Sequence, residues 1–90
     1  MKYLLQQSKR FRQDLRRAEK RAENLRKLFQ VLHYIQQGIP LAAQYRNHRL
    51  WQSEYKNAFE CHICPDFLVI YRFNGHSLKL IRCGSHADLF

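Results

Sequence analysis

One apolar stripe at helical spacing constrains the fold of this chain more than any other feature. Its members follow one another at steps of three or four residues, the spacing of one helix face: Phe11, Leu15, Ala18, Ala22, Leu25, Phe29, Leu32 and Ile35. A single helix over this stretch has about 28 residues and measures roughly 42 Å. The chain has 90 residues, and a domain of that size has a radius of gyration of only about 12 Å. The stripe therefore predicts two antiparallel helices with a break at residues 21–24, where Asn24 caps the second helix.

A hairpin is predicted in the second half of the chain. Residues 67–73 and 77–82 have strand-like composition and flank Asn74-Gly75, a strong turn signal. A two-residue turn there pairs Phe73 with His76. It also places Phe67 opposite Arg82, on the same face of the sheet.

The remaining elements follow from shorter signals. Gly38 suits the left-handed end of the second helix, and Pro40 cannot continue that helix. A loop is expected at residues 39–53, a strand at 55–61 and a short edge strand at 2–6. The predicted order is β-α-α-β-β-β, in a single α+β domain over residues 1–90. Its two N-terminal helices pack on a small, twisted, mainly antiparallel sheet.

Composition restricts the compartment and the partners. No apolar run approaches the roughly 20 residues of a membrane span, and no signal peptide is recognisable. Three cysteines, an odd number, do not form a secreted disulfide framework. We therefore expect a cytoplasmic protein with reduced thiols. The net charge is +9, and residues 1–30 hold ten Lys or Arg against three acidic residues, a net +7. This charge favours RNA, DNA, the ribosome or an acidic protein as partner.

The cysteines raise the alternative of a zinc ribbon. Cys61-x2-Cys64 and Cys83-x2-His86 form a formal ligand set on the two sides of a hairpin. Against this, no glycines surround the first pair, Pro65 removes a backbone amide, and strand side chains three residues apart point to opposite faces. Small buried apolar side chains are the preferred interpretation of the cysteines. A non-catalytic module, either a zinc ribbon or a basic nucleic-acid-binding domain, remains the alternative class.

A second set of residues suits acid-base chemistry. Its members are His48, His62, Asp66, Arg82 and His86. Arg82, Gly84 and His86 alternate, so an extended C-terminal tail keeps Arg82 and His86 on the face that carries Phe67. A cation, an aromatic ring and an imidazole are then expected to converge.

Three segments resemble a known family. They are YRNHRL at residues 45–50, ECHICPDFLVIY at residues 60–71 and RCGSHADLF at residues 82–90. Together they resemble the YafQ-like branch of the RelE/ParE toxin superfamily. The resemblance implies a RelE-like fold and a type II toxin that cleaves mRNA without a metal or cofactor, typically in the ribosomal A site. It also implies a cognate antitoxin, and contact with operator DNA indirectly through the toxin–antitoxin complex.

Matched position by position, the resemblance places the catalytic set on the five residues named above. It adds supporting contacts at Phe67 and Phe90, and we also expect Arg46 and Arg49 to contact RNA. The chain departs from the pattern in three ways. The segment between His48 and His62 is one residue longer, and Arg49 and Phe59 stand where the family often has proline and a basic residue.

The chemistry of metal-free RNA cleavage agrees with these residues. The reaction needs a base for the 2′-hydroxyl proton, an acid for the leaving 5′-oxygen and a cation beside the phosphate. Our hypothesis makes His86 the acid, places His62 with Asp66 on the base side and lets Arg82 stabilise the transition state. His48 shares either proton transfer, and Phe67 or Phe90 stacks on a base. No motif specifies the codon preference or the antitoxin.

Overall fold

The computed structural model describes residues 2–51 and 53–90 as three helices and a five-stranded sheet. The elements are β1 (Leu4–Gln7), α1 (Lys9–Lys20), α2 (Leu25–Gln37), β2 (His48–Arg49), β3 (Phe59–Cys64), β4 (Phe67–Asn74), β5 (Ser77–Gly84) and α3 (His86–Leu89). Two 3-10 turns, η1 (Ala43–Tyr45) and η2 (Ser53–Tyr55), flank β2. The strand order is β1-β5-β4-β3-β2, with β1 parallel to β5 and the other pairs antiparallel. The predicted α+β class is confirmed, and the radius of gyration is 12.1 Å.

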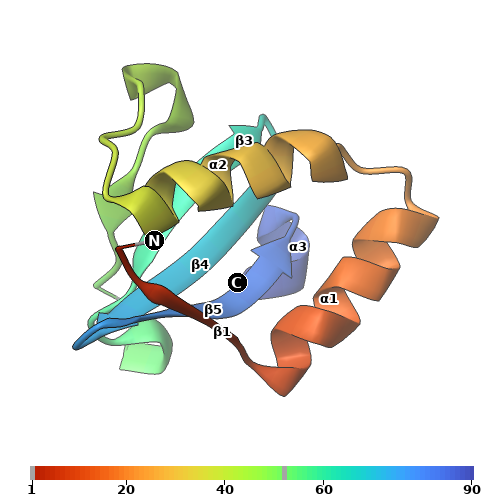
Figure 1. Ribbon diagram of the computed structural model, residues 1–90. Coiled ribbons are helices and arrows are strands. Elements are labelled where there is room, and N and C mark those ends of the chain that lie inside the picture. Colours follow the sequence, from red (N-terminus) through yellow and green to blue (C-terminus); the bar gives the residue numbers. More distant parts are fainter. Residues whose placement is uncertain (1, 52) are drawn as a thin grey trace.

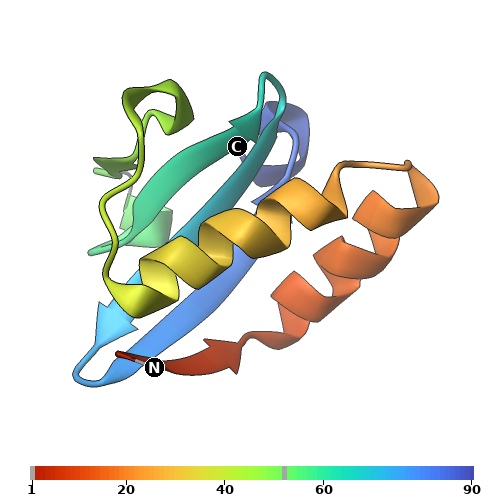
Figure 2. The same ribbon diagram turned by 45° about the horizontal axis from the view of Figure 1, so that its top comes forward.

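The two N-terminal helices fold back on each other as predicted. They run in roughly opposite directions, α2 crosses one face of the sheet, and α3 lies on the other side (Figure 1, Figure 2). The break falls at the expected place because Asn24 caps α2, its side chain accepting a hydrogen bond from the Lys27 backbone at 3.0 Å. Gly38 ends α2 in the left-handed conformation, with φ 74°. Among the described residues, no helix is both long and apolar enough to cross a membrane.

The predicted stripe is confirmed at Leu32 and Ile35, which are buried on α2, but it is wrong at two other positions. Phe29, a predicted core residue, is 52% exposed, whereas Leu28 and Val31 are fully buried. Ala22 lies in the connection with a positive φ and is exposed. The connection interrupts the helical rotation, so the stripe carried over from α1 misplaces Ala22 and Phe29 at the start of α2.

The sheet separates two apolar clusters. The helix-side cluster lies between the sheet and α1 and α2, and its strand members are Cys61, Ile63, Phe67, Val69, Tyr71, Leu78, Leu80 and Cys83. The smaller opposite-side cluster contains Leu50, Tyr55, Ala58, Leu68, Ile70 and Leu89. Alternating strand residues supply the two clusters, as the period of two requires.

The predicted hairpin register is wrong. Asn74 pairs with Ser77, so the turn is Gly75-His76, one residue later than expected. Gly75 has φ 61° and occupies the first central position, where a two-residue hairpin turn of type II′ has glycine. A bulge also shifts the pairing next to Ile70, so that Arg82 lies opposite Ile70 and not opposite Phe67.

Three other local predictions also differ from the structure. The strand expected at residues 55–61 is β3 (Phe59–Cys64), because Asn57 turns the chain with φ 61° just before it. The loop expected at residues 39–53 includes β2, which is too short to show a strand period. The tail expected to be extended is α3, whose Ser85 and Asp88 form a capping box.

Candidate active site

Three histidines form a row on the face of the sheet opposite α2. His48 belongs to β2, His62 to β3, and His86 is the first residue of α3. The ring centroids of His48 and His62 are 6.3 Å apart, and those of His62 and His86 are 5.5 Å apart. Because Cys61 and Ile63 belong to the helix-side cluster, strand alternation directs His62 to the other face. The structure therefore brings together three of the predicted catalytic residues.

Glu60 connects two of these histidines and was missed by the sequence analysis. Its Oε1 lies 3.0 Å from His62 Nε2 and 3.6 Å from His48 Nε2. The residue is only 5% exposed. The sequence does hold a signal, because a residue two positions before His62 in a strand shares its face. Glu60 gives both imidazoles a nearby negative charge.

Asp66 fixes the position of His86. Its Oδ1 accepts a hydrogen bond from the His86 backbone at 2.9 Å and lies 2.8 Å from His86 Nδ1. The backbone hydrogen bond, followed by the one to the imidazole, lowers the pKa of Asp66 below its ordinary value. An ionised carboxylate only accepts hydrogen bonds, so His86 Nδ1 carries a proton. Asp66 thus pairs with His86, whereas the sequence hypothesis had grouped it with His62.

His48 is oriented by the backbone that precedes it. Its Nδ1 lies 2.6 Å from the Arg46 carbonyl oxygen. A carbonyl only accepts, so Nδ1 carries the proton and Nε2, on the Glu60 side, is the basic atom of the neutral ring. Arg46 caps η1 with φ 49°, a left-handed conformation unusual for a residue other than glycine.

Arg82 is separated from solvent. Its Nε and Nη2 donate to Asp14 of α1 at 2.7 and 3.2 Å, and both side chains are nearly buried, at 5% and 3% exposure. The hydrogen bonds that Arg82 donates to Asp14 raise the pKa of Arg82 above its ordinary value. The predicted convergence of Arg82, Phe67 and His86 on one open face is therefore wrong. Asp14 was also missed, although it lies three residues after Phe11 on the buried face of α1.

A family profile matches this chain over nearly its whole length. The family is described as "Bacterial toxin of type II toxin-antitoxin system, YafQ", and the match covers residues 3–90. The chain belongs to this YafQ family.

Individual relatives agree with the family assignment. The mRNA interferase toxin YafQ of Escherichia coli strain B / BL21-DE3 is 34% identical over 87 residues, which span 96% of this chain and 94% of that protein. A chain of the E. coli DinJ–YafQ toxin–antitoxin complex is 30% identical with a TM-score of 0.89, covering 100% of this chain and 99% of its own. A copper-bound mutant toxin from Helicobacter pylori is 31% identical with a TM-score of 0.92, covering 98% and 99%. The predicted YafQ resemblance and RelE-like fold are confirmed.

The predicted RNA contacts of this YafQ-family toxin divide into exposed and buried residues. Phe67 is 1% exposed and belongs to the helix-side cluster, so the prediction that it is available to stack on a base is wrong. Phe90 is 51% exposed, with its ring centroid 6.5 Å from that of His86. The Arg49 guanidinium lies 4.7 Å from the ring centroid of Trp51, which is 81% exposed. Phe90 and Arg49 therefore remain open to RNA.

The cysteines do not form the alternative zinc ribbon. Cys61 and Cys83 are buried in the helix-side cluster and Cys64 packs against it, whereas His86 lies in the row on the other face. Burial raises the pKa of Cys61 and of Cys83 to about 12, so both thiols are protonated at neutral pH. The prediction of buried apolar side chains is confirmed for Cys61 and Cys83, whereas Cys64 is partly exposed.

A different group of residues in this YafQ-family chain has the geometry of a metal site. One ligand atom each from Glu60, His62 and His86 lies within 4.8 Å of the others. Imidazole nitrogens and a carboxylate oxygen are ligands that suit zinc and copper. The three residues fit a metal ion, although two of them also belong to the histidine row.

Proposed function

We propose that this YafQ-family protein is an mRNA endoribonuclease that cleaves RNA by acid-base chemistry at the histidine row. The observation that carries the proposal is the row itself, in which each imidazole has a carboxylate within 3.6 Å. A carboxylate this close orients the ring and stabilises its protonated form. The relatives named mRNA interferase toxins support RNA as the substrate.

The proposed reaction is an internal transfer at one phosphate. A base on the His48–Glu60–His62 side takes the 2′-hydroxyl proton, and the 2′-oxygen bonds to phosphorus. His86 gives a proton to the 5′-oxygen as the bond from phosphorus to that oxygen breaks. The products are a 2′,3′-cyclic phosphate and a 5′-hydroxyl end, so the protons balance and the chemistry needs no metal.

Arg82 and Asp66 act through other residues in this mechanism. Asp66 holds the Nδ1 proton of His86. Arg82 ties β5 to α1 through Asp14 and so fixes the strand from which α3 continues. We therefore propose Arg82 as a positioning residue, since its guanidinium is covered in this structure.

The proposed partners follow from charge and from the relatives. The net charge of +9 suits mRNA and ribosomal RNA. The DinJ–YafQ complex of the relative supports a cognate antitoxin for this chain, expected to be acidic. Through that complex the toxin reaches operator DNA, and the site of action is the ribosome in the cytoplasm.

Single-turnover cleavage of ribosome-bound mRNA tests the proposal. His86→Ala is expected to lower the rate by at least about 100-fold, because one proton transfer is lost. His76→Ala is the matched control, since His76 lies in the hairpin turn away from the row. Wild-type activity should persist in EDTA. Equal rates for the two histidine variants would contradict the assignment of His86, and loss of activity in EDTA would contradict metal-free chemistry.

A second proposal concerns the possible ligands Glu60, His62 and His86. We propose that a zinc or copper ion binds these residues and inhibits cleavage by occupying His62 and His86. The ligand spacing of 4.8 Å or less and the copper-bound relative support it. Titration calorimetry with Zn²⁺ should show about one site per chain, weakened by Glu60→Gln and unchanged by Glu54→Gln. Cleavage that is insensitive to a saturating metal ion would overturn this proposal.

A further inference from the structure

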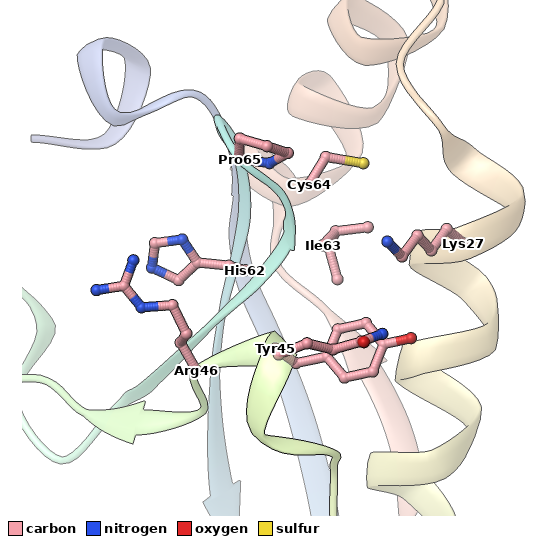
Figure 3. Close-up of a pocket in the computed structure, with 8 residues that line it drawn as sticks. Lys27, Tyr45, Arg46, His62, Ile63, Cys64 and Pro65 are labelled. Carbon is pink, nitrogen blue, oxygen red and sulfur yellow. The ribbon is translucent and has the colours of Figure 1, made fainter.

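A hollow of about 460 Å³ opens beside His62, where β2 leaves the edge of β3 uncovered (Figure 3). β2 pairs only with Phe59 and Glu60, so the rest of this edge is bordered by η1. Lys27, Tyr45, Arg46, His62 and Cys64 are among the lining residues. A volume of this size is in the range of small-molecule sites, about 300–1,000 Å³.

The hollow is positively charged and lacks a compensating acid. None of the described residues that line it is acidic. Lys27 and Arg46 form no ion pair with any other described residue. Arg17, Arg21 and Arg82, by contrast, are paired with Asp14 or Asp88. Two unneutralised cations at the rim of a concave surface favour an anion.

The two cations approach the edge of β3 from different sides. Arg46 extends toward the His62 ring on the face of the histidine row, and Lys27 reaches in from α2 (Figure 3). Lys27 Nζ lies 5.6 Å from the ring centroid of Tyr45, which is placed between them. Because the two cations reach the edge of β3 from different sides, we expect them to bind different phosphates of one strand.

The backbone of Arg46 has an unusual conformation that places the residue beside the histidine row. Its left-handed conformation, with φ 49°, costs about 1–2 kcal/mol for a residue other than glycine. The same conformation presents its carbonyl to His48 Nδ1 at 2.6 Å. Arg46 thus contacts one histidine of the row with its backbone and approaches a second with its side chain. Unfavourable backbone geometry of this kind gathers at functional sites.

We propose that this hollow is a subsite that guides single-stranded RNA from the histidine row over the edge of β3. Arg46 binds the phosphate next to the one that is cleaved, and Lys27 binds the following phosphate. Arginine suits the inner position because its planar donors bind a phosphate in a fixed geometry. The inference rests on the proposed ribonuclease function and adds the path of the substrate.

The test measures binding of an uncleavable RNA oligonucleotide, with 2′-deoxyribose at the cleavage position, by fluorescence anisotropy. Arg46→Gln and Lys27→Gln should each weaken binding about tenfold, as expected for a lost charge-assisted contact. Arg26→Gln is the matched control, because Arg26 adjoins Lys27 on α2 but is exposed and does not line the hollow. It should change the affinity less than about twofold. Arg46→Lys keeps the charge and should recover part of the loss.

Neutral linkages locate each contact. In a series of oligonucleotides with one methylphosphonate each, binding should be weaker when the neutral linkage lies next to the scissile one. Arg46→Gln should abolish that difference in affinity. The effect at the next position should vanish in Lys27→Gln. Urea midpoints equal to wild type show that the variants fold.

Two results would overturn the inference. In the first, Arg46→Gln and Lys27→Gln bind the oligonucleotide as tightly as Arg26→Gln does, or bind it more weakly without changing the effect of any single neutral linkage. In the second, only affinity for the antitoxin falls, which would assign the hollow to a protein segment. If His86→Ala abolishes cleavage while Lys27→Gln and Arg46→Gln bind normally, the subsite fails and the nuclease stands. Linkage-specific binding by a wild-type protein that does not cleave RNA would instead refute the nuclease and retain the subsite.

Discussion

At the scale of single residues, the site depends on which ring nitrogen of each imidazole carries the proton. Asp66 and the Arg46 carbonyl each hold a proton on the Nδ1 of one histidine. This leaves the Nε2 atoms of His86 and His48 available for the proposed proton transfers to and from RNA. Residue types in the sequence indicated imidazole chemistry. Asp66, which sets the tautomer of His86, lies 20 residues before it in the sequence, and no local spacing predicts this pair.

Thiol reactivity is a residue-scale prediction. Cys61 and Cys83 are fully buried, with pKa values raised to about 12 by burial. Cys64 is partly exposed at the hollow. Iodoacetamide at pH 8 should therefore modify only Cys64 in the folded protein and all three cysteines in urea, as read by mass spectrometry. Rapid modification of Cys61 without urea would contradict the buried position of its side chain.

At the scale of elements, two short pieces of structure position the proposed catalytic groups. β2 has two residues and α3 has four, too few for a hydrophobic period to be recognised in the sequence. The capping box of Ser85 and Asp88 was a readable signal for α3. Long elements, with caps at Asn24 and Gly38, were predictable because their signals are local.

The cap of α3 gives a prediction with a defined pH dependence. Hydrogen bonds from the Ser85 backbone and from Arg21 lower the pKa of Asp88 to about 2, below its ordinary value of 3.8. A carboxylate with a lowered pKa stabilises the fold at pH values above its ordinary pKa. This contribution disappears as the pH falls toward 2. Asp88→Asn should cost about 1–2 kcal/mol at pH 7.

Urea unfolding at pH 7 and near pH 2 measures this difference. It should shrink at the lower pH, because the wild-type carboxylate is then being protonated. Glu19→Gln, an exposed site on α1, should change the stability little at either pH. A constant difference between Asp88→Asn and wild type would exclude ionisation of Asp88 as the cause.

The attachment of α1 to β5 gives a second prediction at this scale. Asp14→Asn removes the charge that Arg82 faces in a nearly buried pair. Breaking such a pair costs about 3–5 kcal/mol, since the remaining charge stays buried. Chemical denaturation should show this loss for Asp14→Asn. The double variant Asp14→Leu with Arg82→Met should recover much of it, and failure of the single variant to destabilise would show that the pair does not hold α1.

At the scale of the whole molecule, charge and shape act together. The basic charge lies mainly in the first 30 residues, and α1 and α2 carry most of it. Fold class and the order of the main elements could be predicted from periodicity and turns. The pairing position of Arg82 in the sheet could not be predicted. It depends on a one-residue bulge in β5, which simple rules for strand pairing do not include. Phe67 belongs to the helix-side face of β4 together with Val69 and Tyr71.

Salt dependence tests the charge argument for the whole molecule. The logarithm of RNA affinity should fall linearly with the logarithm of salt concentration, with a slope of about 0.7 for each phosphate contacted in single-stranded RNA. Arg46→Gln and Lys27→Gln should each reduce that slope by about 0.7, and Arg26→Gln should leave it unchanged. Equal slopes for all three variants would mean that the charge acts only as a diffuse field.

The alternation of β3 limits where such a toxin can change in length during evolution. Glu60 and His62 serve the site from one face of this strand, and Cys61 and Ile63 serve the helix-side cluster from the other. One residue inserted within β3 would reverse the facing of every strand residue on one side of it, so that a carboxylate or an imidazole enters the apolar cluster. An insertion between residues 50 and 58 precedes β3 and so leaves the alternation of that strand unchanged. Lineages of this fold should therefore vary in length ahead of β3, while the strand itself keeps a fixed number of residues.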